Sequence, residues 1–202
     1  MSVRAYQARS RPRKSERTRA QITTVVLQML ADGRFHESTM EEIAAEARIS
    51  RATLYQHFRS RVDLVDTICD TFEVNPALID VKASVDLPDP LEALPRTIAR
   101  VVEFWASEDG VLRELYGVVA LDPAAAELVR RQREDRRSVL RRLAHRLHVS
   151  RATRTGVSEA RVLDRLMVIT SYETYSELRL AGRSAAQTAH ELQQIARELL
   201  LR

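Results

Sequence analysis

The chain has 202 residues, of which 45% are hydrophobic and 30% charged, with only 5 glycines and 6 prolines. This balance is typical of a soluble helical protein and argues against a disordered or sheet-rich one. A single cysteine excludes an intrachain disulfide and favours a reducing, cytoplasmic location. No apolar stretch approaches the ~18 residues that a membrane span needs, so no membrane partner is expected.

Positive charge is concentrated at the N-terminal end. Residues 1–61 contain 12 lysines and arginines against 6 acidic residues, although the whole chain has a net charge of only +4. Such an excess favours binding to a polyanion, because neutralised phosphates release their counterions. The arginine-rich start lacks the apolar segment of a secretory signal; an organelle transit peptide is the alternative interpretation.

The first elements are an arm and a helix. Residues 1–14 show no periodicity and are expected to form a flexible basic arm. A first helix is predicted over about 15–31, because Ile22, Val26 and further apolar residues share one face. Gly33 can end this helix in a left-handed conformation.

Two short helices joined by a three-residue turn come next. Thr39 begins the first of them with a T-x-x-E capping box. Ser50 can cap the other, in which Leu54 and Phe58 lie four residues apart on an inner face. This is the plan of a helix-turn-helix over roughly residues 39–58, a motif whose second helix enters the major groove of double-stranded DNA.

The rest of the chain is also expected to be helical. Polar spacing at Ser60 and Asp63 indicates a fourth helix, and the proline-rich, acidic stretch 73–95 should hold its end and a loop. Helical patterning continues at about 91–107, 110–121, 122–147 (opened by Asp122 and Pro123), 158–181 and 184–201. The sequence therefore predicts an all-α fold of about nine helices.

The outward side of the third helix carries the residue types that read DNA. Arg51 can donate two hydrogen bonds to guanine, worth ~1–3 kcal/mol of discrimination. Gln56 can pair with adenine, Ala52 allows close approach, and Tyr55 offers a hydroxyl or a ring. The candidates for phosphate contacts are Thr53, His57 and Arg61. The alternative is an ordinary solvated helix face.

In this region the sequence resembles the TetR family of transcriptional regulators, the family of the tetracycline repressor. The resemblance covers about residues 15–68 and runs through Thr39–Ala44, Ala47–Ser50, Thr53–Phe58 and Arg59–Leu64. Family members typically have T-x-x-x-I-A, A-G-V-S, T-x-Y-x-x-F and K-x-x-L there. Two positions depart from this pattern. Arg48 replaces the turn glycine, where a left-handed backbone would cost ~1 kcal/mol or more unless the turn differs, and Arg61 replaces the lysine.

The resemblance implies a DNA-binding domain at 15–68 and a domain at 69–202 that dimerises through its last two helices and encloses a small-molecule pocket. It also implies a homodimer on a palindromic operator, released by an unidentified effector. Thr39 is then a further backbone contact, and the basic arm from Arg9 to Arg19 could follow the minor groove or the phosphates. For Arg4 to Arg11 a disordered solubility tail is the alternative interpretation. The alternatives are a regulator without a ligand, an activator of the same fold, and, more distantly, a helical enzyme.

Two sets of residues are candidates within 69–202. Apolar stripes on the last two helices supply the dimer candidates Leu163, Leu166, Thr170, Leu192, Ile195 and Leu199. Side chains that could line a cavity are Phe104, Trp105, Tyr116, Met167, Tyr172 and Tyr175. Ordinary monomer core is the alternative interpretation of both sets.

The sequence does not indicate catalysis, a cofactor or a metal. His145 and His148 lie three residues apart without the further ligands that a metal site needs. Cys69 has no histidine nearby in sequence, and no glycine-rich phosphate loop is present. Seven arginines between 130 and 142 make one helix strongly basic; a solvated face is the simplest interpretation, with a second DNA contact or an acidic ligand as alternatives.

Overall fold

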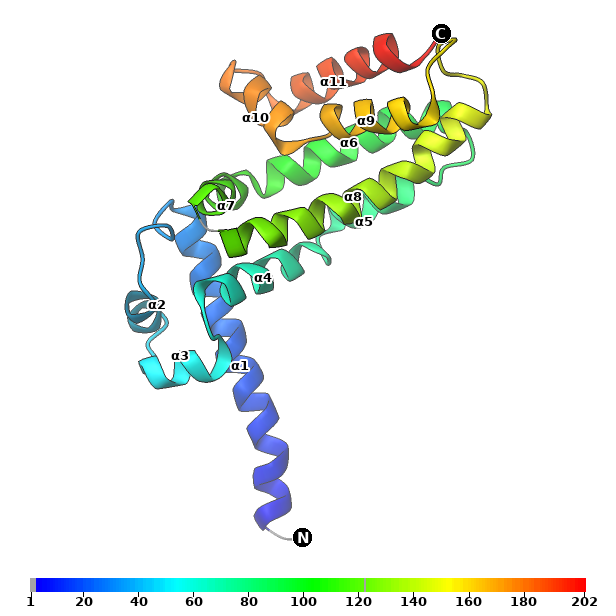
Figure 1. The fold of residues 1–202 in the computed structure, drawn as a ribbon. Coiled ribbons are helices and arrows are strands. Elements are labelled where there is room, and N and C mark those ends of the chain that lie inside the picture. Colours follow the sequence, from blue (N-terminus) through cyan, green and yellow to red (C-terminus); the bar gives the residue numbers. More distant parts are fainter. Residues whose placement is uncertain (1–2, 122) are drawn as a thin grey trace. The chain divides into compact units, whose positions relative to one another are not determined.

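The computed structural model describes the backbone of residues 3–121 and 123–202, and within them the side chains of residues 14–117 and 126–202. Eleven α-helices make up the regular structure of these ranges (Figure 1), together with an isolated bridge between Thr153 and Leu201. The all-α prediction is confirmed, with more helices than the nine expected. The helices fall into two compact units. Unit 1 is Met1–Thr71 with Gly110–Ala126, and unit 2 is Phe72–Asp109 with Glu127–Arg202.

Unit 1 contains a long helix, two short ones and most of two more. They are α1 (Val3–Ala31), α2 (Met40–Glu46), α3 (Arg51–His57), α4 (Arg61–Phe72) and α7 (Asp109–Leu121). Its core is formed by side chains that are at most 1% exposed, among them Ile22, Val26, Leu54, Phe58 and Leu64. The apolar spacings noted in the sequence therefore mark the inner faces of α1 and α3.

The two ends of α1 differ in how well the sequence predicts them. Helical backbone begins at Val3 instead of near residue 15. The other end agrees with expectation, since Gly33 has φ +69° and its N–H donates to Leu30. The next N–H, of Arg34, donates to the Met29 carbonyl at 2.9 Å, so two carbonyls of the last turn are satisfied.

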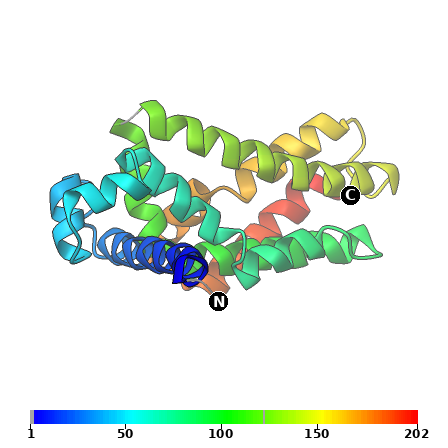
Figure 2. The same cartoon turned by 90° about the horizontal axis from the view of Figure 1, so that it is seen from below.

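Within the described residues, unit 2 contains five whole helices and most of a sixth (Figure 2 shows the chain from below). They are α5 (Pro76–Ser84), α6 (Pro90–Ser107), α8 (Pro123–Val149), α9 (Glu159–Ile169), α10 (Tyr172–Leu180) and α11 (Ala185–Leu200). α6 packs against α5 and α11, and α11 also packs against α9 and α10. The start of α8 at Pro123 was expected, whereas its predicted cap, Asp122, lies outside the described residues.

Two local features account for the helices found in addition to the nine that the sequence predicted. Asn75 caps α5 by accepting from the Ala77 N–H at 2.9 Å, and Pro76 occupies the first turn, where proline fits a helix. The prediction that 73–95 holds only a helix end and a loop was therefore wrong. The expected helix 158–181 is divided at Thr170 and Ser171, because the Ser171 hydroxyl accepts from the Thr174 N–H and starts α10.

Candidate nucleic-acid interface

The helix-turn-helix begins with the predicted capping box on α2. The Thr39 hydroxyl accepts from the Glu42 N–H at 3.2 Å. The Glu42 carboxylate in turn accepts from the Thr39 N–H at 2.7 Å and from its hydroxyl at 2.9 Å. These donors, the backbone N–H first, lower the pKa of Glu42. The hydroxyl proposed as a DNA contact thus also fixes the start of α2.

The turn between α2 and α3 keeps a left-handed residue without a glycine. Arg48 has φ +52°, so the strained alternative considered from the sequence is the one adopted. Its N–H donates to Ala45, and the following N–H, of Ile49, donates to Ala44, both at 3.0 Å. These two bonds satisfy the last carbonyls of α2 and set the direction in which the chain leaves the helix.

α3 presents one buried and one exposed side. Ser50 caps it by accepting from the Thr53 N–H at 3.0 Å. Leu54 and Phe58 are almost fully buried. The exposed side carries the four residues expected to read bases, Arg51, Ala52, Tyr55 and Gln56. The structure therefore brings these four together on one accessible face.

Arg51 is oriented by two neighbours on that face. Its Nε lies 2.8 Å from a carboxylate oxygen of Glu41, which comes from α2. Its guanidinium carbon lies 5.5 Å from the centroid of the Tyr55 ring, within cation–π range. The side chain stays 65% exposed, so its terminal N–H groups remain accessible to solvent and to a ligand.

The phosphate candidates are tied into the protein to different degrees. The Thr53 hydroxyl is 2.8 Å from that of Ser50. His57 is half-buried at the end of α3. Arg61 donates to the carbonyls of Phe35 at 2.5 Å and His36 at 3.2 Å. The guanidinium of Arg61 thus links the start of α4 to the segment between α1 and α2, a role that the sequence did not indicate.

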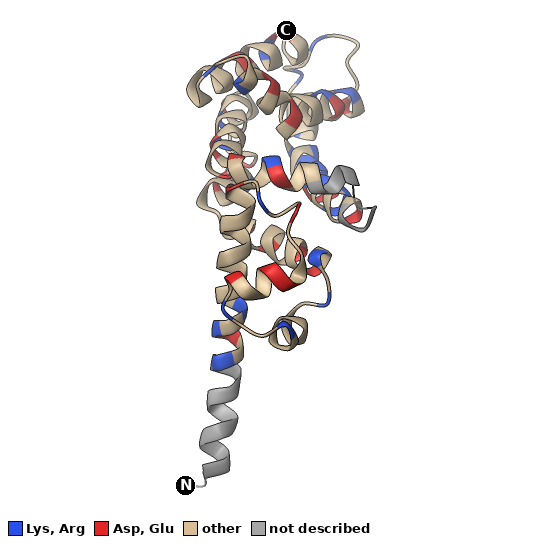
Figure 3. Cartoon of the chain, turned by 90° about the vertical axis from the view of Figure 1, so that its left-hand side faces the viewer, with Lys and Arg blue, Asp and Glu red and all other residues tan. Residues whose placement is uncertain are grey.

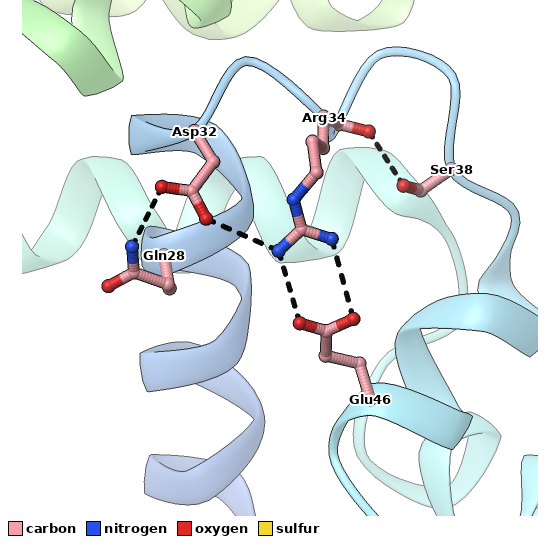
Figure 4. A network of polar contacts seen from close by, with 5 residues as sticks. All are labelled: Gln28, Asp32, Arg34, Ser38 and Glu46. Carbon is pink, nitrogen blue, oxygen red and sulfur yellow. Dashed lines mark hydrogen bonds and ion pairs between the residues drawn. The ribbon is translucent and has the colours of Figure 1, made fainter.

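A further arginine links the end of α1 to α2 (Figure 4). The guanidinium of Arg34 donates to both carboxylate oxygens of Glu46, at 3.1 and 3.4 Å, and to Asp32 at 3.3 Å. Gln28 donates to Asp32, and the Ser38 hydroxyl donates to the Arg34 carbonyl. The carboxylates, Glu46 first, raise the pKa of Arg34. Both ends of α2 are therefore anchored by polar contacts.

The segment between α1 and α2 also contacts α7. The Glu114 carboxylate accepts from the His36 N–H at 2.8 Å and lies 2.6 Å from Nδ1 of the same residue. The hydrogen bond that the His36 ring donates to Glu114 raises the pKa of His36. The sequence gave no signal for this pair, because the two residues are far apart along the chain.

Charge on this part of the protein is mixed (Figure 3). α2 carries Glu41, Glu42 and Glu46 and has no basic residue, whereas α3 carries Arg51. The described part of α1 adds the basic residues Lys14, Arg17 and Arg19. The positive excess of the N-terminal end therefore lies mainly on α1 and not on the helix-turn-helix itself.

The pocket candidates of unit 2 form a chain of aromatic rings. Phe104 lies 4.9 Å from Trp105, and Tyr172 lies 5.8 Å from both Trp105 and Tyr175, measured between centroids. Trp105 Nε1 donates to the Thr170 carbonyl, and the Tyr172 hydroxyl donates to Asp109. Met167 is half-buried on α9, whereas Tyr116 belongs to unit 1. Four of the six candidates thus share one packed cluster.

Burial divides the dimer candidates into two groups. Leu163, Leu166, Thr170 and Leu192 are at most 5% exposed within a single chain, so they form monomer core, the alternative left open by the sequence. Ile195 is half-buried and Leu199 is 43% exposed. Only the last two can supply appreciable contact area to another protomer without rearrangement.

The arginines of α8 are mostly paired. Arg130, Arg133, Arg137 and Arg142 form ion pairs with carboxylates, and Arg136 donates to the Thr170 carbonyl. This pattern agrees with a solvated, locally neutralised face. Within the described residues no cluster of histidine, cysteine and acidic side chains could hold a metal ion. No described helix is both long and apolar enough to cross a bilayer.

The two short helices α2 and α3, joined by the left-handed turn, have the arrangement of a helix-turn-helix. Residues 22–68 match the family model of the bacterial regulatory proteins of the tetR family. The match places this family's domain over α2, α3 and parts of α1 and α4.

Two curated relatives agree with that assignment. The chain is 27% identical over 103 residues to the HTH-type transcriptional regulator AcrR of Shigella flexneri, covering 50% of this chain and 48% of AcrR. It is 28% identical over 93 residues to the HTH-type transcriptional repressor BepR of Brucella suis biovar 1 (strain 1330), covering 46% and 44%. The chain thus spans about half the length of the curated relatives it matches.

Solved structures share the fold over nearly the whole chain. The secondary repressor NalD of Pseudomonas aeruginosa superposes with a TM-score of 0.70 at 18% identity, covering 94% of this chain and 98% of NalD. The SmeT–triclosan complex superposes with a TM-score of 0.71 at 14% identity, covering 92% of both chains. Similarity at this level of identity supports the fold alone.

Proposed function

We propose that the protein is a sequence-specific, DNA-binding transcriptional repressor. The observation that carries the proposal is the exposed face of α3, where Arg51, Ala52, Tyr55 and Gln56 stand clear of a buried side anchored by Leu54 and Phe58. In a helix-turn-helix such a face meets base edges in the major groove. Thr39, Thr53 and His57 are the proposed backbone contacts. Arg61 is a weaker candidate, because its Nη atoms already donate to the carbonyls of Phe35 and His36.

The proposed active species is a homodimer on a palindromic operator. One seven-residue helix buries little surface, so tight specific binding calls for two half-sites about one helical turn apart. The exposed apolar residues Val168 on α9 and Leu199 on α11 offer contact area for a second copy. Sedimentation should detect a dimer at micromolar concentration, and a stable monomer would contradict this part of the proposal.

Release by a small molecule is the proposed mode of control. A ligand that binds better to a dimer with separated reading helices would shift the population towards that state and weaken operator binding. Support comes from SmeT, a protein of the same fold solved with triclosan bound. An activator or a ligand-independent regulator of the same fold is the alternative function.

The function is tested by selecting bound fragments from genomic DNA. We expect an enriched palindromic sequence for the native protein and none for Arg51→Ala combined with Gln56→Ala. Binding to all fragments alike by the native protein would contradict sequence-specific regulation. The recovered operator then identifies the neighbouring genes and the effectors to be tried.

Trp105 provides the first test of a ligand, because it is the only tryptophan and lies in the aromatic cluster. Triclosan is a suitable first probe. A ligand of this cluster should change the fluorescence of Trp105 and release operator DNA over the same concentration range. Release without any change in fluorescence would place the ligand elsewhere.

A further inference from the structure

Arg19 of α1 lies at the C-terminal end of the DNA-reading helix. Its guanidinium carbon is 4.4 Å from the centroid of the Phe58 ring, which is 1% exposed and ends α3. Nη1 donates to the His57 carbonyl at 3.1 Å, and Nη2 donates to the Thr67 hydroxyl at 2.8 Å. One side chain therefore joins α1, the end of α3 and α4.

The contacts of Arg19 stabilise the C-terminal end of the short helix α3. The last carbonyls of any helix lack intrahelical partners and carry the negative end of the helix dipole, so a cation there is favourable. α3 has seven residues, too few to hold a direction by its own hydrogen bonds. Its orientation is set by Ser50 at one end, by the buried Leu54 and Phe58 beneath it, and by Arg19 at the other end.

The same contacts distinguish Arg19 from a phosphate ligand. The sequence allowed the arm up to Arg19 to follow the DNA backbone. In the structure both terminal nitrogens of Arg19 donate within the protein, and the guanidinium faces an aromatic ring. Arg17, two residues earlier on α1, carries the same charge, and both arginine side chains are exposed.

We propose that Arg19 is a positioning residue for DNA reading: it fixes the C-terminal end of α3 through Phe58, the His57 carbonyl and Thr67, and does not itself bind phosphate. This inference rests on the proposed function of α3. It predicts that the geometry of the guanidinium matters and that its charge alone does not suffice, because lysine offers neither a planar fork nor the same stacking.

The experiment compares Arg19→Lys and Arg19→Ala with the native protein on the selected operator and on a random duplex of equal length. Both variants should lose about tenfold in operator affinity, the order expected for one charged hydrogen bond. Affinity for the random duplex should change little. The slope of log affinity against log salt should stay unchanged, because no phosphate contact is lost.

Two further variants serve as controls. Arg17→Ala removes an equal charge from α1 without touching α3, so the ratio of operator to random affinity should stay native. Thr67→Ala removes one acceptor of Arg19 without changing any charge. Its ratio of operator to random affinity should lie between those of the native protein and Arg19→Ala. Measurements are made well below the unfolding transition of each variant, so that a mere loss of stability leaves the ratio unchanged.

Two results would overturn the inference. Native operator affinity for Arg19→Lys, together with a salt slope reduced by about one for Arg19→Ala, would identify a phosphate contact instead. An unchanged ratio for Arg19→Ala would show that its contacts do not affect reading. Failure of the native protein to prefer any sequence would contradict the proposed function itself, and the inference with it.

Discussion

Unit 1 holds two seven-residue helices in place with polar links, whereas unit 2 joins longer helices through apolar stripes and a chain of aromatic rings. In unit 1, Arg19, Gln21 and Arg34 reach from α1 and the turn after it to the ends of α2 and α3. In unit 2, rings such as Trp105 and Tyr172 pack directly against one another. The two units are therefore stabilised by different kinds of contact, and these contacts differ in how visible they are in the sequence.

Helix length explains the difference. A helix of two turns forms only with external support, so its caps and clamps require particular residue types at fixed places. Such a pattern is visible in a sequence. A long amphipathic helix needs only an apolar stripe, which many residues can supply. Its sequence therefore shows that it is buried without showing what it binds.

The largest expected effect is the loss of stability when a buried aromatic ring is removed from either unit. Phe58→Ala should lower the free energy of unfolding by ~3–5 kcal/mol, because a fully buried ring is lost and a cavity remains. Urea unfolding measures the loss. Tyr175→Ala, at 1% exposure in unit 2, should cost a similar amount.

The two core variants should differ in DNA binding when both are folded. Phe58→Ala also removes the ring beneath Arg19 and should abolish sequence preference, whereas Tyr175→Ala should retain it. If both variants kept the native sequence preference, the proposed difference between the two units in DNA binding would be contradicted. Operator binding at low temperature provides the measurement.

Loss of a serine cap is the next effect in size. Ser50→Ala and Ser171→Ala should each cost ~1 kcal/mol of stability, because an N–H at the start of α3 or α10 loses its acceptor. Only Ser50→Ala should also weaken operator binding. Thermal unfolding together with operator titration tests both statements, and an equal effect of the two variants on DNA affinity would contradict them.

Each unit offers a matched site of backbone strain. Arg48 and Arg151 have φ of +52° and +57°, a conformation that costs a non-glycine residue about 1 kcal/mol. Arg48→Gly and Arg151→Gly should therefore each raise stability slightly. Arg48→Ala is the control, because alanine also has a Cβ atom and is equally disfavoured in the left-handed backbone conformation. Stabilisation by alanine equal to that by glycine would mean that the strain is not the cause.

The smallest effect is a dependence on pH in unit 1. Glu114 raises the pKa of His36, so the protonated pair stabilises the fold fully below the pKa of unfolded histidine. This contribution is lost as the pH rises through the higher folded pKa. The melting temperature of the native protein should fall more over that window than that of Glu114→Gln. Parallel curves for the two proteins would contradict the assignment.

The sequence predicted the elements that rest on local chemistry. The capping box at Thr39, the cap at Ser50 and the inward pair Leu54 and Phe58 are all present, since each depends on residues three or four positions apart. The left-handed Arg48 was anticipated as one of two possibilities. Side chains four apart on one face also located the exposed side of α3.

Contacts between distant segments could not be predicted in the same way. Nothing in the sequence pairs His36 with Glu114, or Arg61 with the carbonyl of Phe35. The apolar stripes of α9 and α11 could equally face a second chain or the core, and burial of Leu166 and Leu192 assigns those two to the core. Amphipathic periodicity gives the buried side of a helix but not its partner.

The base preference of Arg51→Ala tests the central proposal most directly. Affinities for operators substituted at each position should show that one position in each half-site loses its preference, by ~1–3 kcal/mol, while the others keep theirs. Such a result would place Arg51 on a base edge. A uniform loss at all positions, or an unchanged profile, would contradict the account of α3 as the reading helix.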